Sequence, residues 1–201
     1  TTNETSFFRD AHVFVTLAEN KLPGLLPTRR DRSLRVWSAA CSTGQEPYSL
    51  GILLLEHPEL RGWDVSIRAT DLCSTVLAKA ESGLYRAHEI QRGLSDAQRE
   101  RWFEPSGRHW AVRRRLRELV SFATWNLLDP NPPAGPFDLV FLRNVLIYFD
   151  APTQQRVLRS IHRSMAPGAL LVLGGTEAAT RVPAGCFDVE REERSTWLRR
   201  R

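Results

Sequence analysis

Three polar side chains interrupt an apolar part of the sequence where a buried strand is expected to end. Arg143, Asn144 and Tyr148 lie in FLRNVLIYFD at 141–150, which overlaps the apolar run FDLVFL at 137–142. Polar groups in such a position cost desolvation free energy unless they are paired or line a cleft. We therefore favour a cleft with binding or catalytic side chains over a satisfied core.

A second segment has the form of a nucleotide-binding turn. The sequence VWSAACSTGQEPY at 36–48 predicts a strand, a turn of small residues and a helix, which brings backbone close to a ligand in α/β folds. Because the turn contains only Gly44, an ordinary strand–helix turn is the favoured explanation of this segment by itself. Asp71 ends the next predicted strand, where a carboxylate can accept both hydroxyl groups of a ribose. Capping of the following helix is the alternative role for Asp71.

Three further features are weaker by themselves. Asn126 is a polar residue at a strand end, with turn formation as the alternative. The first ten residues, TTNETSFFRD, predict a helix N-terminus on which Arg9 is a solvated charge. The run RRRLR at 113–117 indicates a solvated face first, and a surface for an acidic protein or phosphates second.

An alternation of strands and helices positions these residues. Apolar runs and helical spacing predict strands at 35–39, 64–70, 137–142 and 169–173, and helices at 46–55, 74–82 and 153–165. Strands separated by helices of this length indicate an α/β fold with a mostly parallel sheet and crossover connections.

One segment departs from this order. Apolar and charged residues alternate from Trp102 to Phe122 around a turn at 105–107, which predicts a small antiparallel hairpin inserted into the α/β order. We expect one domain over residues 1–201, with 102–122 as the inserted β-subdomain.

The composition excludes several protein classes. With 42% hydrophobic and 25% charged residues, the 201-residue chain is ordinary for a globular domain. No apolar run reaches the ~18 residues of a membrane span, so no membrane insertion is expected. Three widely spaced cysteines, without metal-ligand spacing, predict no disulfide framework, no metal and a cytoplasmic location. The formal charge of +5, carried almost entirely by arginine, indicates an acidic partner.

Five segments, in order and at plausible spacing, carry a family resemblance. They are TNETSFFRD at 2–10, VWSAACSTGQEPYSL at 36–50, ATDLCSTVLAKAESGLY at 69–85, FDLVFLRNVLIYFD at 137–150 and PGALLVLGGTE at 167–177. Together they span nearly the whole chain and resemble the CheR family of chemotaxis receptor methyltransferases. The resemblance implies the Rossmann-like fold of methyltransferases that use S-adenosylmethionine (SAM).

The resemblance also implies a reaction and a set of site residues. A methyl group would pass from SAM to glutamate carboxylates on the cytoplasmic helices of chemoreceptors, leaving S-adenosylhomocysteine (SAH). Arg9 and Tyr148 would be the catalytic residues beside the transferred methyl group. The residues implied at SAM are Asn3, Thr5, Arg9, Ala40, Glu46, Asp71, Asn126, Leu127, Arg143 and Asn144. Because a glutamate with a pKa of ~4.3 is already deprotonated at neutral pH, no general base is required.

The sequence differs from the family pattern at three places. The family usually carries an N-terminal helical domain before the TNET-like segment, and we expect receptor binding to be weaker for the given sequence, which starts at that segment. The turn at 105–107 is short and poor in glycine, so we expect no binding of a receptor tether peptide. GGTE at 174–177 replaces the common GHSE and is expected to alter the pocket wall.

Two alternatives stay open at this point. One is a SAM-dependent methyltransferase that acts on RNA or a small molecule. The other is a non-catalytic SAM- or SAH-binding signalling module. Because the hairpin lacks the aromatic platform of an RNA-binding sheet, we expect no nucleic-acid partner.

Overall fold

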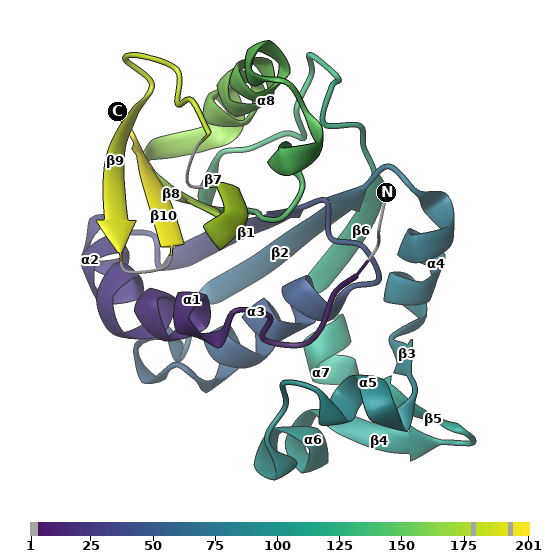
Figure 1. The fold of residues 1–201 in the computed structure, drawn as a ribbon. Coiled ribbons are helices and arrows are strands. Elements are labelled where there is room, and N and C mark those ends of the chain that lie inside the picture. Colours follow the sequence, from purple (N-terminus) through teal and green to yellow (C-terminus); the bar gives the residue numbers. More distant parts are fainter. Residues whose placement is uncertain (1–3, 178–179, 193–194) are drawn as a thin grey trace.

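A mixed seven-stranded sheet forms the centre of the molecule (Figure 1). The computed structural model describes residues 4–177, 180–192 and 195–201. The strands are β1 (Ser33–Ala39), β2 (Asp64–Asp71), β6 (Val120–Thr124), β7 (Phe137–Leu142), β8 (Met165–Leu173), β9 (Phe187–Glu192) and β10 (Ser195–Arg200). Their order is β6-β2-β1-β7-β8-β10-β9, and all neighbours are parallel except those involving β10. The predicted mostly parallel sheet is confirmed.

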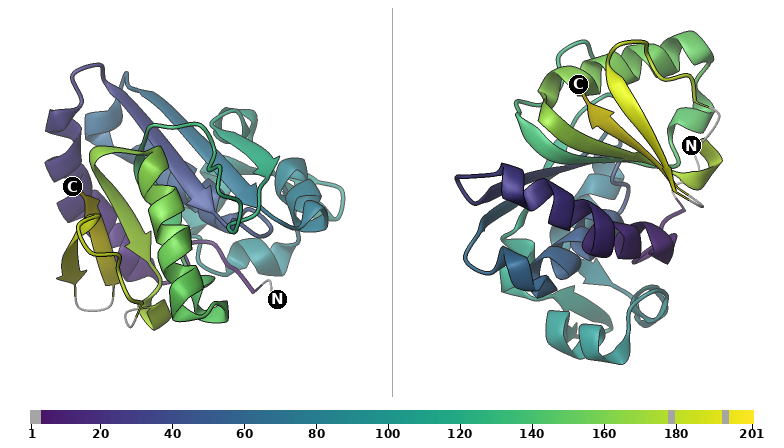
Figure 2. Two further views of the ribbon diagram at one scale, coloured as in Figure 1. Left: turned by 90° about the horizontal axis from the view of Figure 1, so that it is seen from above. Right: turned by 90° about the vertical axis from the view of Figure 1, so that its left-hand side faces the viewer.

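Helices cover both faces of this sheet (Figure 2). One face carries α1 (Ala11–Thr16), η1 (Leu17–Lys21), α2 (Leu22–Leu25), η2 (Leu26–Thr28) and α3 (Gln45–Glu56); the opposite face carries α8 (Ala151–Ser164). Side chains alternate along β1, so that Val36 packs in the core under α1–α3 while Trp37 packs in the core under α8. No helix among the described residues has the length and apolar character of a membrane span.

A small antiparallel sheet stands apart from the large one (Figure 1). It consists of β3 (Leu84–Tyr85), β5 (His109–Val112) and β4 (Phe103–Ser106), and the nearby helices are α4 (Ser74–Ser82), α5 (Ala87–Gln91), α6 (Asp96–Trp102) and α7 (Arg114–Arg117). The expected hairpin forms between β4 and β5. Residues 120–122, expected in the same hairpin, instead belong to β6 and pair in parallel with β2. Alternating apolar and polar residues are compatible with a strand of either sheet, so the sequence pattern alone did not show to which sheet residues 120–122 belong.

The strand order creates a crevice between β1 and β7. From β1 the chain proceeds through β2 to β6 on one side, and β7 and β8 lie on the other side. In open α/β sheets, ligands bind at the carboxyl ends of the strands where the order reverses in this way. The topology therefore places a ligand site beside Ala39 and Leu142, the last residues of β1 and β7.

A segment without regular secondary structure, residues 4–10, precedes α1 and is called here the N-terminal strap. Its Phe7 ring is fully buried and makes edge contacts with Tyr85 and Phe103, with ring centroids 5.0 and 5.4 Å away. Gly93 lies so close that a Cβ atom there would be 1.8 Å from the Phe7 carbonyl oxygen. The small sheet and the loop after α5 thus fix the strap.

Replacing Gly93 by alanine is expected to displace the strap. Gly93 has a φ of +95°, and Gly62, with a φ of +76° and open space around it, is a matched control. Both alanines carry the cost of a left-handed backbone, about 1–2 kcal/mol. Gly93→Ala adds an overpacking cost of about 1–3 kcal/mol, because its neighbour is backbone. Urea unfolding gives the free energy of unfolding of both variants. An equal loss of stability in the two variants would show that Gly93 does not hold the strap.

Candidate functional site

A cavity of about 420 Å³ opens at the carboxyl ends of the central strands. Ten of the residues that the sequence analysis implied at the site line it: Thr5, Arg9, Ala40, Glu46, Asp71, Asn126, Leu127, Arg143, Asn144 and Tyr148. Asn3 lies outside the described residues. The structure thus brings together side chains from the strap and from the ends of β1, β2, β6 and β7, while their individual roles stay predictions.

The turn after β1 shapes one wall of this cavity. Ala40, Ser42 and Gly44 all have positive φ angles, of +61°, +49° and +92°. A Cβ atom at Gly44 would lie 2.8 Å from the Tyr85 hydroxyl oxygen and 2.9 Å from the Ala80 Cβ. Glycine is therefore required at 44 by both backbone conformation and space, and the turn lies tightly against its neighbours.

Two buried tyrosines hold this turn against β3 and the start of α3 against α4. The Tyr85 hydroxyl donates to the Thr43 carbonyl at 2.7 Å, and the Tyr48 hydroxyl donates to the Ala80 carbonyl at 3.0 Å. Burial raises the pKa of Tyr48 to about 12 and the pKa of Tyr85 well above its usual value. Both hydroxyls are therefore neutral donors over the physiological pH range.

Asp71, at the end of β2, presents a carboxylate to the cavity. Its Oδ2 accepts from the Ser42 N–H at 2.9 Å and its Oδ1 accepts from the Cys73 N–H at 3.0 Å. These bonds fix the carboxylate through two backbone donors. Since a carboxylate offers about four lone-pair sites, acceptor capacity remains for two hydroxyl groups of a ligand. The alternative of helix capping is not what the structure shows, because α4 begins after the N-cap residue Cys73 without a side-chain cap, and Asp71 forms only a local turn with the Cys73 N–H.

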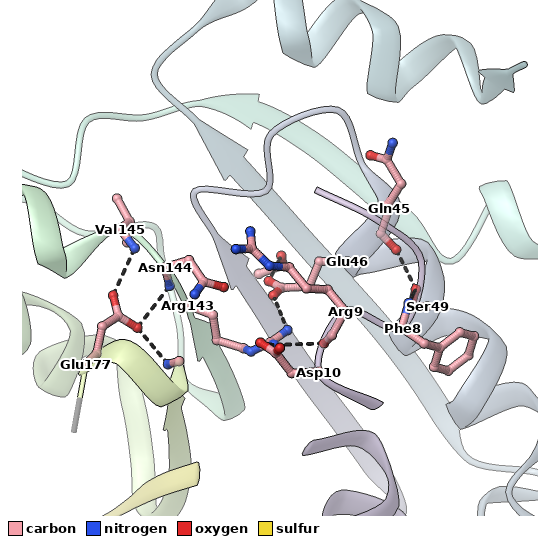
Figure 3. A network of polar contacts seen from close by, with 12 residues as sticks. Phe8, Arg9, Asp10, Gln45, Glu46, Ser49, Arg143, Asn144, Val145 and Glu177 are labelled. Carbon is pink, nitrogen blue, oxygen red and sulfur yellow. Dashed lines mark hydrogen bonds and ion pairs between the residues drawn. The ribbon is translucent and has the colours of Figure 1, made fainter. Parts of the chain in front are cut away.

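A buried guanidinium joins three elements beneath the cavity (Figure 3). The side chain of Arg143 is 2% exposed; its Nη1 pairs with the Glu46 carboxylate at 3.1 Å. Its Nη2 donates to the Asp10 carboxylate at 2.6 Å and to the Arg9 carbonyl at 2.8 Å. The second oxygen of Glu46 accepts from the Ser38 hydroxyl at 2.7 Å. Arg143, the first residue after β7, thereby holds the strap to α3 and β1.

The protonation of Glu46 depends on this network. Burial raises the pKa of the Glu46 carboxyl, and the charge of Arg143 together with the Ser38 hydroxyl lowers it, with burial the larger effect. Removing Arg143 would take away an effect that lowers this pKa, so Glu46 would take up a proton more readily.

Several residues of this network were missed by sequence analysis. Asp10 and Ser38 were within quoted segments but were given no role, because no local pattern shows that Asp10 pairs with a residue as distant in sequence as Arg143. Glu177 was noted only as part of GGTE, yet it is 2% exposed and accepts from the Asn144 N–H at 2.9 Å. Among the described residues, no three His, Cys, Asp or Glu side chains gather as a metal site would require.

Sequence comparison identifies the family. Residues 3–192 match the family model described as CheR methyltransferase, SAM binding domain. The chain belongs to this family. The resemblance drawn from five segments is thereby confirmed, and the match extends across the small antiparallel sheet.

Relatives of this CheR-family chain match most of its length. It is 42% identical over 188 residues to chemotaxis protein methyltransferase Cher2 of Pseudomonas putida, covering 91% of this chain and 68% of that protein. It is 43% identical over 188 residues to chemotaxis protein methyltransferase 1 of Pseudomonas aeruginosa, covering 91% and 69%. The chain therefore spans about two thirds of the length of these relatives.

Solved structures support the fold. The glycopeptide N-methyltransferase MtfA, in complex with sinefungin, superposes with a TM-score of 0.52 at 13% identity, covering 98% of this chain and 71% of that chain. At this identity the likeness concerns the fold alone. It agrees with the methyltransferase fold class expected from the sequence.

Loss of the Arg143 guanidinium is expected to destabilise the protein strongly. Arg143→Met leaves the Glu46 and Asp10 carboxylates without their shared partner, at a cost of about 3–5 kcal/mol. Arg114→Met, which removes an exposed pair with Glu118, is the control and should change stability little. The measurement is the free energy of unfolding in urea. Similar losses in the two variants would show that the Arg143 pairs contribute no more to stability than a surface pair.

Proposed function

We propose that this CheR-family chain transfers a methyl group from SAM to glutamate side chains of chemoreceptors, giving glutamate methyl esters and SAH. The main support for this proposal is that ten residues implied by the family resemblance, from five separate parts of the chain, line one cavity. The names of its relatives support the chemotaxis substrate. Since the methylated receptor helices are cytoplasmic, the proposed location is the cytoplasm.

The cavity fits the chemical groups of SAM. The two-point anchoring of Asp71 leaves acceptors for the ribose hydroxyl groups. Leu72 and Leu127 supply apolar surface for an adenine ring, and the Asn126 amide, whose Oδ1 accepts from the Leu128 N–H at 2.9 Å, has two N–H donors for the ring nitrogens. Glu46 also lines the cavity, beside the strap, and its carboxylate would favour a positively charged methionine group.

The proposed catalytic residues act by placing the acceptor carboxylate. SAM, when bound, supplies an electrophilic methyl group. Arg9 and Tyr148 both line the cavity, and Tyr148 is half exposed at its mouth. A guanidinium and a phenol can orient a carboxylate without removing a proton, which suits an acceptor that is already ionised. Alignment and partial desolvation of the two reactants then account for the rate enhancement.

Chemoreceptor helices rich in glutamate are the proposed partner. The net charge of +5 favours an acidic surface, and the arginines of the segment 113–117 are the proposed contact. Two of them are partly neutralised, because Arg113 pairs with Glu104 at 3.1 Å and Arg114 with Glu118 at 2.6 Å. For the small sheet we propose no tether-peptide binding, since β4 and β5 are joined by a short turn.

The alternatives make different predictions. An RNA methyltransferase would bind RNA with an affinity that falls steeply as salt rises, because phosphate contacts release counterions. A non-catalytic module would bind SAM or SAH and give no turnover with any acceptor. Methyl transfer to a receptor fragment is expected only under the proposal.

Asp71→Asn is expected to weaken SAH binding by about tenfold or more, since hydrogen bonds to a charged acceptor contribute about 1.5–3 kcal/mol. Asp64→Asn, at the exposed opposite end of β2, is the matched control. Calorimetric titration measures both affinities. An unchanged SAH affinity in Asp71→Asn would show that Asp71 does not bind the ribose.

Tyr148→Phe is expected to retain SAH affinity and to lower methyl transfer to a receptor fragment by about tenfold, the effect of one lost hydrogen bond to the acceptor. Transfer is followed with isotopically labelled SAM at saturating concentrations. A variant as active as the wild type would show that the phenol hydroxyl takes no part in orienting the carboxylate.

A further inference from the structure

One buried carboxylate holds the turn that carries two cavity residues (Figure 3). Oε2 of Glu177, on the 3-10 turn η5 (Gly175–Glu177), accepts from the Asn144 N–H at 2.9 Å and from the Gly174 N–H at 2.6 Å. Oε1 accepts from the Val145 N–H at 2.8 Å and the Leu146 N–H at 2.7 Å. Four backbone donors therefore converge on a single side chain that is 2% exposed.

The convergence requires an unusual backbone. Asn144 has a φ of +59°, a left-handed conformation that turns successive N–H groups toward one point. Such an arrangement needs an acceptor, because buried N–H groups without a partner are destabilising. A carboxylate, with about four lone-pair sites, matches four donors.

Gly174 shows how closely this arrangement is packed. A Cβ atom at this position would lie 2.8 Å from Oε2 of Glu177 and 3.0 Å from the Asn144 nitrogen. A side chain at 174 would therefore push the carboxylate or the turn out of place. The sequence GGTE at 174–177 thus supplies both the acceptor and the space for it.

The held turn leads directly to the cavity. It continues as the 3-10 turn η4 (Leu146–Tyr148), and both Asn144 and Tyr148 line the cavity. At its other end, the Gln154 amide donates to the Leu146 carbonyl at 3.0 Å and to the Phe149 carbonyl at 3.1 Å. Since Tyr148 is half exposed, its position depends mainly on this backbone.

We propose that Glu177 is a positioning residue for methyl transfer. Its carboxylate fixes the backbone of residues 144–146, so that Asn144 is directed to the bound adenosine or methionine group and Tyr148 to the acceptor carboxylate. Glu177 itself touches neither reactant. The inference rests on the proposed function of the cavity and adds a residue that acts through Tyr148 and Asn144.

A double-mutant cycle on receptor methylation tests the link to Tyr148. Glu177→Gln preserves shape but turns amide N–H groups toward the backbone donors, and we expect kcat to fall about tenfold while the KM for receptor changes less than about threefold. In a Tyr148→Phe background the same substitution should cost less than about threefold, because its effect passes through the phenol. Equal fold losses in both backgrounds would assign Glu177 a merely structural role and overturn the proposal.

A control variant and a replacement variant complete this test. Glu59→Gln, on an exposed turn, is the charge-matched control and should leave kcat unchanged. If Glu177→Gln does not fold, as judged by circular dichroism, Glu177→Asp replaces it in the cycle, because it keeps the charge but shortens the reach.

A second cycle separates this proposal from the proposed function. If the wild-type chain methylates no receptor fragment, the proposed function fails, and SAH affinity then tests the positioning. Glu177→Gln is expected to weaken SAH binding by about threefold or more in the wild-type background and by less than about twofold in Asn144→Ala. Hydrogen exchange at the amides of residues 144–146 should accelerate in Glu177→Gln. Unchanged amide exchange in Glu177→Gln, or an equal loss of SAH affinity in the wild-type and Asn144→Ala backgrounds, would overturn the positioning role.

Discussion

The buried ion pairs of Arg143 are the constraint on which the site depends. A guanidinium that is 2% exposed must find its charge and hydrogen-bond partners inside the protein, because desolvation is costly. Its partners come from the strap and from α3, and Glu46 of α3 is in turn bound to Ser38 of β1. Pairing the two terminal nitrogens of this side chain therefore fixes the end of β7, the floor of the cavity and the segment that crosses it.

The other walls of the cavity are fixed by similar local requirements. The turn after β1 fits only because residue 44 is glycine, and its contacts extend to Tyr85 of the small sheet. The same tyrosine packs against Phe7 of the strap, so the small sheet supports both the ligand turn and the strap. On the far side, Glu177 holds the backbone that carries Asn144. The site thus has few free parts, which suits a reaction whose catalysis consists of alignment.

Much of this could be predicted from sequence, and the exceptions have physical reasons. Strands at β1, β2 and β7 and helices α3, α4 and α8 were predicted because periodicity and turn signals are local. The residues of β6 were assigned to the hairpin because alternating apolar and polar residues do not show which strand they pair with. In the structure β6 pairs in parallel with β2. Asp71, Asn126, Arg143, Asn144 and Tyr148 were singled out by residue type and position, and the family resemblance implied the other predicted cavity residues. Asp10 and Glu177 were missed because their roles arise from contacts between distant segments.

The most direct test of the account is methyl transfer to a purified cytoplasmic fragment of a chemoreceptor. The chain is incubated with labelled SAM, and peptides of the fragment are analysed by mass spectrometry alongside the SAH produced. The account predicts base-labile methyl esters on glutamate side chains, formed in equal amount to SAH and reduced in Tyr148→Phe. Tight binding of SAM and SAH with no methylated glutamate in the fragment would contradict it.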